Sequence, residues 1–127
     1  MCSSDLGLIN ATVPKVNLIV DKAIGSAYTV MNSKALGADM VFALEGAQVG
    51  PMKPELAAQI VAADGDKTAK ADAEAMIKAQ ISAEAAARRG YVDNIITADS
   101  ARKNLVYAFE MLYLKEEGRP DKKHGTI

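Results

Sequence analysis

The 127-residue sequence has one cysteine, one histidine and no tryptophan. A single cysteine cannot form an internal disulfide, so no disulfide framework is expected. Cys2 and His124 together provide too few nitrogen and sulfur ligands for a structural zinc cluster. The sequence therefore predicts no metal site.

Neither sign of charge dominates the chain. Fifteen Lys and Arg residues stand against 16 Asp and Glu, which gives a net charge of −1 and no basic surface for nucleic acid. No apolar run approaches the roughly 20 residues that span a bilayer. The start of the chain also lacks the order of basic and then apolar residues that marks a secretory signal. We expect a cytoplasmic chain that neither binds nucleic acid nor inserts into a membrane.

The length fits one domain, or a large part of one, because half of the residues are apolar. Residues 1–7 are predicted to be a leader, since 1–6 fit neither a helix nor a strand pattern. Cys2 to Leu6 also match the peptide that a common sequencing adapter encodes, which favours a non-native leader over a flexible natural terminus. The folded part is expected at 8–117, followed by an extended polar tail at 118–127.

The first half of the folded part alternates between strands and a helix. Short apolar runs predict strands at 13–20, 39–44 and 47–50. A turn is expected at 21–26, followed by a helix at 27–36 that ends near Gly37. This order indicates a parallel crossover and hence an α/β fold.

The second half is predicted to be mainly helical. Helices are expected at 55–63, at 69–89 and after Thr97, with a short strand within 91–96. The segment 64–66 should end the first of these helices. The segment 69–89 is either one helix or two that break near 81–83, where Ser82 could cap the second.

Most signatures of a self-contained enzyme are missing. No serine or cysteine has a recognisable nucleophile setting, no histidine lies inside the folded part, and neither a Walker nor a dinucleotide glycine pattern is present. Any chemistry must then rely on backbone groups or on residues outside this chain.

The turn Gly25-Ser26-Ala27-Tyr28 offers such backbone groups. Small residues that open a helix expose unpaired N–H donors, and the helix dipole adds partial positive charge there. Such donors could hold a developing oxyanion. The spacing alone equally fits an ordinary tight turn between a strand and a helix.

A longer pattern resembles a known family. Ile24 to Lys34, read as Ile-Gly-Ser-Ala-Tyr-Thr-Val-Met-Asn-Ser-Lys, is similar to the Gly-Gly-Ala-Tyr-x-x-Met-x-Ser-Lys segment of biotin-dependent acyl-CoA carboxyltransferase subunits. These include propionyl-CoA carboxylase β chains and the carboxyltransferase chains of methylmalonyl-CoA and glutaconyl-CoA decarboxylases. The resemblance continues at Pro14 to Val16, at Arg89 to Ile96 and at Arg119 to Gly125, and it covers nearly everything after Gly7.

The resemblance implies a crotonase-like (ClpP/crotonase) α/β fold, of which this chain would be the C-terminal portion. It also implies transfer of a carboxyl group between biotin on a carrier protein or domain and an acyl-CoA, in a homo- or hetero-oligomer. Gly25, Ser26, Ala27 and Tyr28 would then bind biotin, and the N–H groups of Ser26 and Ala27 would be the oxyanion donors. The isolated chain would be inactive, because the acyl-CoA domain lies elsewhere.

Two departures from the family pattern bear on the site. Ser26 stands where the family usually has a second glycine. Serine keeps the backbone N–H, but its side chain leaves less room for a ligand oxygen to approach that N–H. Glu45 lies in a segment where the family has Trp-Pro. Its carboxylate is interpreted as a solvated loop group, with lining of the pocket as the alternative.

Two other functions stay open at this point. One is a biotin-independent hydrolase or isomerase of the same fold, which would use the turn for a thioester oxyanion. The other is a noncatalytic scaffold subunit that retains the fold.

Overall fold

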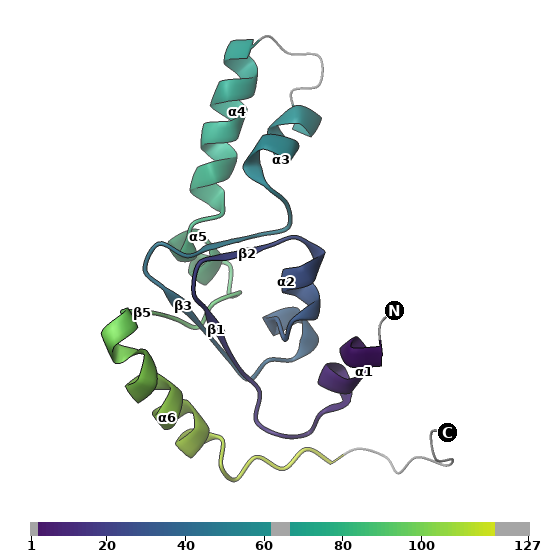
Figure 1. Cartoon of the computed structure of the whole chain (residues 1–127), viewed down its shortest axis with the longest axis vertical. Helices are drawn as coiled ribbons and strands as arrows, with labels where there is room; N and C mark the ends of the chain where they lie inside the picture. Colours follow the sequence, from purple (N-terminus) through teal and green to yellow (C-terminus); the bar gives the residue numbers. More distant parts are fainter. Residues whose placement is uncertain (1–2, 62–66, 119–127) are drawn as a thin grey trace.

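The computed structural model describes residues 3–61 and 67–118 (Figure 1). Six α-helices, two short 3-10 helices and five strands form this part of the chain. In chain order they are α1 (Ser3–Asn10), β1 (Val16–Ile19), β2 (Lys22–Ile24), α2 (Ser26–Val30), η1 (Lys34–Leu36), β3 (Met40–Leu44), β4 (Gln48–Gly50), α3 (Pro54–Val61), α4 (Lys67–Gln80), α5 (Ala83–Arg88), β5 (Asn94–Ile96), η2 (Ala98–Ser100) and α6 (Ala101–Met111).

The central sheet has the strand order β1-β3-β5, and both pairs are parallel. Its middle strand β3 is apolar throughout and buries Val41, Phe42 and Ala43, as expected for a parallel strand covered on both faces. The strands expected in 13–20, 39–44 and 91–96 are therefore confirmed, with shorter bounds. The parallel crossover between the first two is also confirmed.

A second sheet pairs β2 with β4, again in parallel. The strand expected at 47–50 is confirmed as β4. The turn expected at 21–26 is wrong, because residues 22–24 form β2 instead. Three residues carry no strand signal of their own, and only pairing with a segment 26 residues further along the chain makes them a strand.

The helix expected at 27–36 is broken into two short pieces, α2 and η1. Between them Asn32 has φ +56, a left-handed conformation that asparagine tolerates better than most residues. Asn17 Nδ2 donates to Asn32 O at 3.0 Å, which holds this break in place. Gly37 ends η1 at φ +86, close to the expected helix end.

The sequence left open whether 69–89 forms one helix or two, and the structure shows two. α4 ends at Gln80 and α5 begins at Ala83, and the Ser82 hydroxyl accepts from Ala85 N at 3.2 Å as the predicted cap. α3 and α4 pack on each other and project from the sheets as a hairpin (Figure 1). The segment 64–66, expected to end the helix before it, lies outside the described residues.

The two ends of the described chain differ from expectation in detail. Residues 3–10 form α1, so the assignment of 1–6 to no helix or strand is wrong for residues 3–6. Near the other end, Thr97 precedes the 3-10 turn η2 rather than α6 directly, and it makes no side-chain cap bond to the backbone. His124 and the tail expected at 118–127 lie outside the description, apart from Gly118.

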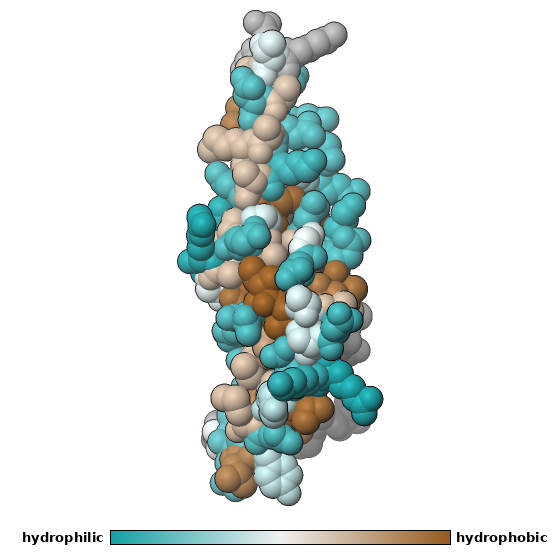
Figure 2. Space-filling model, turned by 90° about the vertical axis from the view of Figure 1, so that its left-hand side faces the viewer, coloured by the Kyte–Doolittle hydropathy of each residue, from teal (hydrophilic) through white to brown (hydrophobic). Residues whose placement is uncertain are grey.

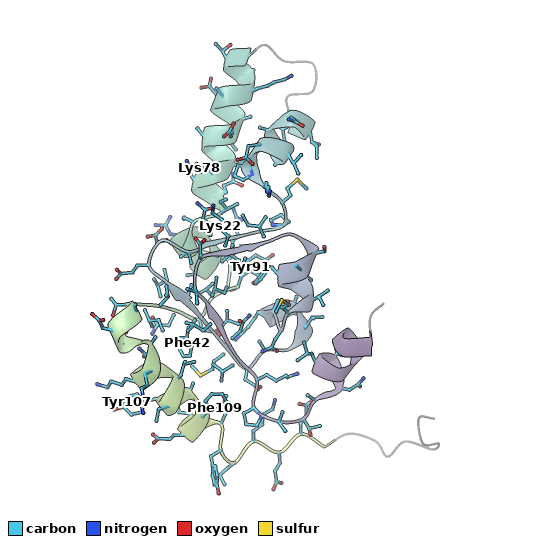
Figure 3. All side chains as sticks on the ribbon, in the orientation of Figure 1. Lys22, Phe42, Lys78, Tyr91, Tyr107 and Phe109 are labelled. Atoms are coloured by element: carbon cyan, nitrogen blue, oxygen red, sulfur yellow. The ribbon has the colours of Figure 1, made fainter. Side chains whose placement is uncertain are left out.

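The core lies on both faces of the central sheet. On one face α5 and β4 pack against it through small side chains, among them Ala47, Ala83 and Ala86. On the other face Phe42 and Ile96 contact Ala108 of α6, and Figure 3 shows Phe42 between the sheet and that helix. Alanine at these positions permits close approach of the packed elements.

Many large apolar side chains stay exposed on the helices. Leu56, Ile60 and Met76 lie exposed on the α3–α4 hairpin, and Val106 and Phe109 on α6. Figure 2 shows apolar atoms gathered at mid-height of one face, below the hairpin. Within residues 3–61 and 67–118, none of the helices has both the length and the hydropathy of a membrane span.

The first testable consequence concerns Gly50. A Cβ at this position would come within 2.7 Å of Ile81 Cγ2, so Gly50→Ala should lower the free energy of unfolding by about 1 to 3 kcal/mol. Urea unfolding measures it, and Gly118→Ala is the control, since nothing lies within 4 Å of its Cβ. In the background Ile81→Ala the cost of Gly50→Ala should shrink, and simple additivity would contradict the assigned clash.

A second consequence concerns acid stability. Lys115 Nζ lies 2.8 Å from Asp39 Oδ1, and Lys15 N donates to Asp39 Oδ2 at 2.7 Å. Burial by itself would raise the pKa of Asp39, but hydrogen bonds from Lys115 and Lys15 outweigh it, so the pKa lies below its ordinary 3.8. The ionised form therefore stabilises the fold above the ordinary pKa, and this contribution is lost as the pH falls through the lowered value.

Asp39→Asn should lower the free energy of unfolding by about 1 kcal/mol at pH 7. The free energy of unfolding of this variant should also fall less steeply as the pH is lowered. Urea unfolding between pH 2 and pH 7 measures both effects. Asp99→Asn is the control, because Asp99 is exposed and has no ion pair within the described residues. Equal acid slopes for Asp39→Asn and the parent chain would contradict the assignment.

Candidate functional site

The turn between β2 and α2 is held by a backbone hydrogen bond and a glycine conformation. Gly25 N donates to Gly50 O at 3.0 Å. Gly50 is the last paired residue of β4, and Gly25 directly follows Ile24, the last paired residue of β2. Gly25 has φ +85 and ψ −166, a backbone conformation that side chains disfavour. A Cβ there would meet only Pro51 O at 3.9 Å, so the dihedral angles rather than lack of space require glycine.

Two backbone donors follow this glycine. Ser26 and Ala27 are the first two residues of α2, and within the described residues neither N–H has a hydrogen-bond partner. Both residues are exposed. α2 has only five residues, so any charge stabilisation would come from these N–H groups themselves more than from a helix dipole.

A cavity of about 480 Å³ opens beside the turn. Ala27, Tyr28 and Met31 line one side, and residues 17–24 of the β1–β2 corner line the other. Val20 and Met31 are largely exposed and make its wall apolar, while Asp21 and Lys22 add charge. The structure thus places Ala27 and Tyr28 in this cavity, and it leaves the Ser26 side chain outside the lining.

Tyr28 has two environments. Its ring packs against the core cluster that contains Val41 and Val49, and it also lines the cavity. Its hydroxyl oxygen is buried and has no hydrogen-bond partner among residues 3–61 and 67–118. Burial raises the pKa of Tyr28 above its ordinary 10.0, and nearby Tyr91 raises it further, so the hydroxyl stays protonated at neutral pH.

Glu45 is placed away from the site. It is exposed in the turn between β3 and β4, its N–H donates to Ile96 O at 3.2 Å, and it lines none of the cavities described. The interpretation as a solvated loop residue is therefore confirmed.

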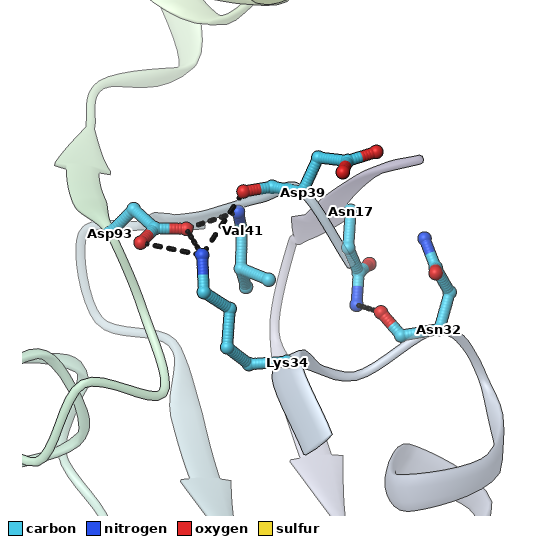
Figure 4. A network of polar contacts seen from close by, with 6 residues as sticks. All are labelled: Asn17, Asn32, Lys34, Asp39, Val41 and Asp93. Carbon is cyan, nitrogen blue, oxygen red and sulfur yellow. Dashed lines mark hydrogen bonds and ion pairs between the residues drawn. The ribbon is translucent and has the colours of Figure 1, made fainter. Parts of the chain in front are cut away.

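The segment that follows α2 is anchored by a network of polar contacts (Figure 4). Lys34 Nζ donates to both carboxylate oxygens of Asp93, at 2.7 and 2.8 Å, and to Asp39 O at 3.0 Å. Asp93 also accepts from Val41 N at 2.8 Å, so its carboxylate joins η1 to the central strand β3. Ser33, nearly fully buried, donates to Thr29 O at 2.8 Å.

The network gives Ser33 and Lys34 a structural role. Both belong to the sequence pattern around the turn, yet neither side chain lines the cavity beside Ala27. Sequence reasoning missed this role because Lys34 and Asp93 are 59 positions apart. Among the residues described, no group of three or more His, Cys, Asp or Glu is placed to hold a metal ion.

Comparison with known proteins gives a consistent result. The pattern of the carboxyl transferase domain matches residues 6–127. A Bacillus subtilis (strain 168) protein, provisionally named a propionyl-CoA carboxylase beta chain, is 47% identical over 124 residues. Methylmalonyl-CoA decarboxylase subunit alpha of Propionigenium modestum is 44% identical over 125 residues. Each comparison covers 92% of this chain and 24% of the relative, so the chain spans about a quarter of the length of these curated relatives.

Solved structures agree with the sequence comparison. The crystal structure of transcarboxylase 12S, described as a hexamer with methylmalonyl-coenzyme A and methylmalonic acid bound, superposes with a TM-score of 0.90 at 32% identity. It matches 97% of this chain, which covers 24% of it. The beta subunit of Pseudomonas aeruginosa geranyl-CoA carboxylase shares the fold, with a TM-score of 0.76 at 19% identity over 96% of this chain and 25% of its own. The expected crotonase-like α/β fold is confirmed.

The polar network leads to a prediction on Asp93. Asp93→Ala leaves the N–H of fully buried Val41 without its acceptor, so unfolding free energy should fall by about 2 kcal/mol in urea titrations. Lys34→Met keeps that acceptor and removes a partly exposed ion pair together with the hydrogen bond to Asp39 O, so it should cost less than the loss at fully buried Val41. A larger loss for Lys34→Met than for Asp93→Ala would show that the Val41 contact is not the dominant one.

Proposed function

Since the chain belongs to the carboxyl transferase domain family, we propose that it is part of an enzyme that moves a carboxyl group between carrier-linked biotin and an acyl-CoA. The observation that carries this proposal is the family match over residues 6–127. The names of the relatives support it, because they are acyl-CoA carboxylases, decarboxylases and a transcarboxylase. Carboxylation and decarboxylation are the same transfer in opposite directions, so one site serves both.

The chain supplies one portion of that enzyme. Residues 8–117 form the C-terminal part of the second carboxyltransferase domain, and the acyl-CoA domain belongs to the longer protein. A biotin carboxyl carrier protein or domain is the partner that delivers biotin. The hexamer described for transcarboxylase 12S supports an oligomeric enzyme. We also propose the cytoplasm as its compartment.

The turn is assigned to the biotin side of the reaction. Biotin, when bound, would supply the nitrogen that carries the carboxyl group and a ureido oxygen able to take up negative charge. Ser26 and Ala27 are exposed, and their N–H groups have no partner in the part of the chain that the structure describes, so they are free to donate to this oxygen. Gly25 sets the turn that presents them, and Tyr28 closes the cavity behind them.

The surroundings of these donors fit such a group. The cavity beside Ala27 has apolar walls at Val20 and Met31, which suit a ring with apolar faces. No side-chain nucleophile or base is required of this chain, because the charge is stabilised electrostatically. This accounts for the missing catalytic signatures.

The test removes one donor. Ala27→Pro lacks the N–H at a position in the first helical turn where no bond within the helix is lost. Carboxyl exchange between methylmalonyl-CoA and carrier biotin should fall about 100-fold in the full-length enzyme, with CoA binding unchanged. Ala27→Gly keeps the N–H and is the matched control.

The outcomes separate the proposal from its alternatives. If Ala27→Pro loses stability, Ser26→Pro removes the neighbouring donor at the first helical position, where proline fits. Unchanged exchange in both variants would reject the turn as donor. Thioester turnover that avidin does not inhibit would indicate a biotin-independent enzyme, and failure of the full-length protein to bind biotin or CoA would indicate a scaffold.

A further inference from the structure

Helix α2 carries the two proposed donors, yet its own packing holds it only weakly. It has five residues, and none of them is fully buried. The bond from Gly25 N to Gly50 O ties its N-terminal end to β4, and Tyr28 packs it on the apolar core. The direction in which the Ser26 and Ala27 N–H groups point therefore also depends on what holds the C-terminal end of the helix.

The side chain of Asn17 holds that C-terminal end. Its Nδ2 donates to Asn32 O at 3.0 Å, a bond that Figure 4 shows, and more weakly to Met31 O at 3.4 Å. Both carbonyls directly follow α2, at the place where a helix leaves its last oxygens without partners. Within the described residues, neither oxygen accepts a bond from any backbone N–H. The Asn17 amide thus supplies the donor that the backbone does not.

Asn17 is itself fixed in the central sheet. It lies in β1 opposite Val41, a fully buried residue of the middle strand β3. A carboxamide suits two neighbouring acceptors, because its nitrogen has two hydrogens to donate. The two Asn17 bonds therefore connect the end of α2 to the buried centre of the sheet.

We propose that Asn17 is a positioning residue for the carboxyl transfer, which orients the N–H groups of Ser26 and Ala27 by fixing the C-terminal end of α2. This role rests on the proposed function. Without the Asn17 bonds, α2 can pivot about the bond from Gly25 N to Gly50 O at its other end. A pivot there changes the direction of the two donors more than their position, and hydrogen bonds weaken steeply when they are misaligned.

The test is Asn17→Leu in the full-length enzyme, since leucine has a similar volume and no amide. The kcat of carboxyl exchange should fall about tenfold, while the KM for carrier biotin should change less than about threefold and CoA binding should not change. Asn17 also lines the cavity beside Ala27, and loss of a direct contact with the substrate would instead raise KM at unchanged kcat.

Asn94→Leu is the matched control. Asn94 lies in β5 of the same sheet, is exposed, and its side chain makes no hydrogen bond within the described residues. The same chemical change at this position should leave kcat as it is in the parent enzyme.

A double-mutant cycle separates orientation of the donors from a general weakening of the fold. In Ala27→Pro one donor is already absent, so adding Asn17→Leu should lower kcat by about threefold at most. A defect that only weakens the fold would lower the activity of both backgrounds by the same factor.

Amide hydrogen exchange tests the Asn17 bonds without any use of activity. The N–H groups of Thr29 and Met31 bond to Gly25 O and Ala27 O, and in Asn17→Leu they should exchange about tenfold faster, with exchange in β3 unchanged. If Asn17→Leu does not fold, Asn17→Val takes its place, because valine also lacks the amide and favours strands.

Four results would overturn the role of Asn17: unchanged amide exchange at Thr29 and Met31, an unchanged kcat, a raised KM at unchanged kcat, or an equal loss of activity in the Ala27→Pro background. Absence of carboxyl exchange in the parent enzyme would instead reject the carboxyl transfer itself. Faster amide exchange in Asn17→Leu would then still show that Asn17 holds α2, so the two failures are distinguishable.

Discussion

The rest of the site depends on one backbone hydrogen bond, from Gly25 N to Gly50 O. It directly follows the last residue pair of β2 and β4 and fixes where α2 begins. Both ends require glycine, for different reasons. Gly25 adopts a positive φ, and Gly50 lies so close to Ile81 that a side chain would clash. The position of the Ser26 and Ala27 donors is thus coupled to the packing of the α4–α5 junction on β4.

The sequence pattern around the turn combines two roles. Its first part provides the turn and the free N–H groups, while Ser33 and Lys34 hold the following segment to the central sheet. Asp93 lies in the segment Arg89 to Ile96, which also resembles the family. Its carboxylate accepts hydrogen bonds from Lys34 and from the backbone N–H of Val41, so it belongs to the same set of contacts. A pattern spread over widely separated segments therefore corresponds to one connected set of contacts in the fold.

Tyr28 connects the proposed reaction site with the rest of the domain. Its ring packs on the core and also borders the cavity beside the turn. α2 contains no fully buried residue, so this ring is the main apolar anchor of the helix. A change on one side of the ring would therefore reach the donors on the other through direct contact rather than through a long pathway.

The sequence by itself determined the α/β class, the strands within 13–20, 39–44, 47–50 and 91–96, Ser82 as the candidate cap if 69–89 breaks into two helices, and the glycine turn that begins at Gly25. These features depend on runs of apolar residues, capping side chains and glycines that act over a few neighbouring positions. Tertiary structure decided that residues 22–24 form a strand, that Asn32 breaks the expected helix, and that Lys34 pairs with Asp93. It also decided that the Tyr28 hydroxyl is buried, with no partner in the described part of the chain. Each of these depends on groups brought together from distant parts of the chain, and local preference contains no information about such contacts.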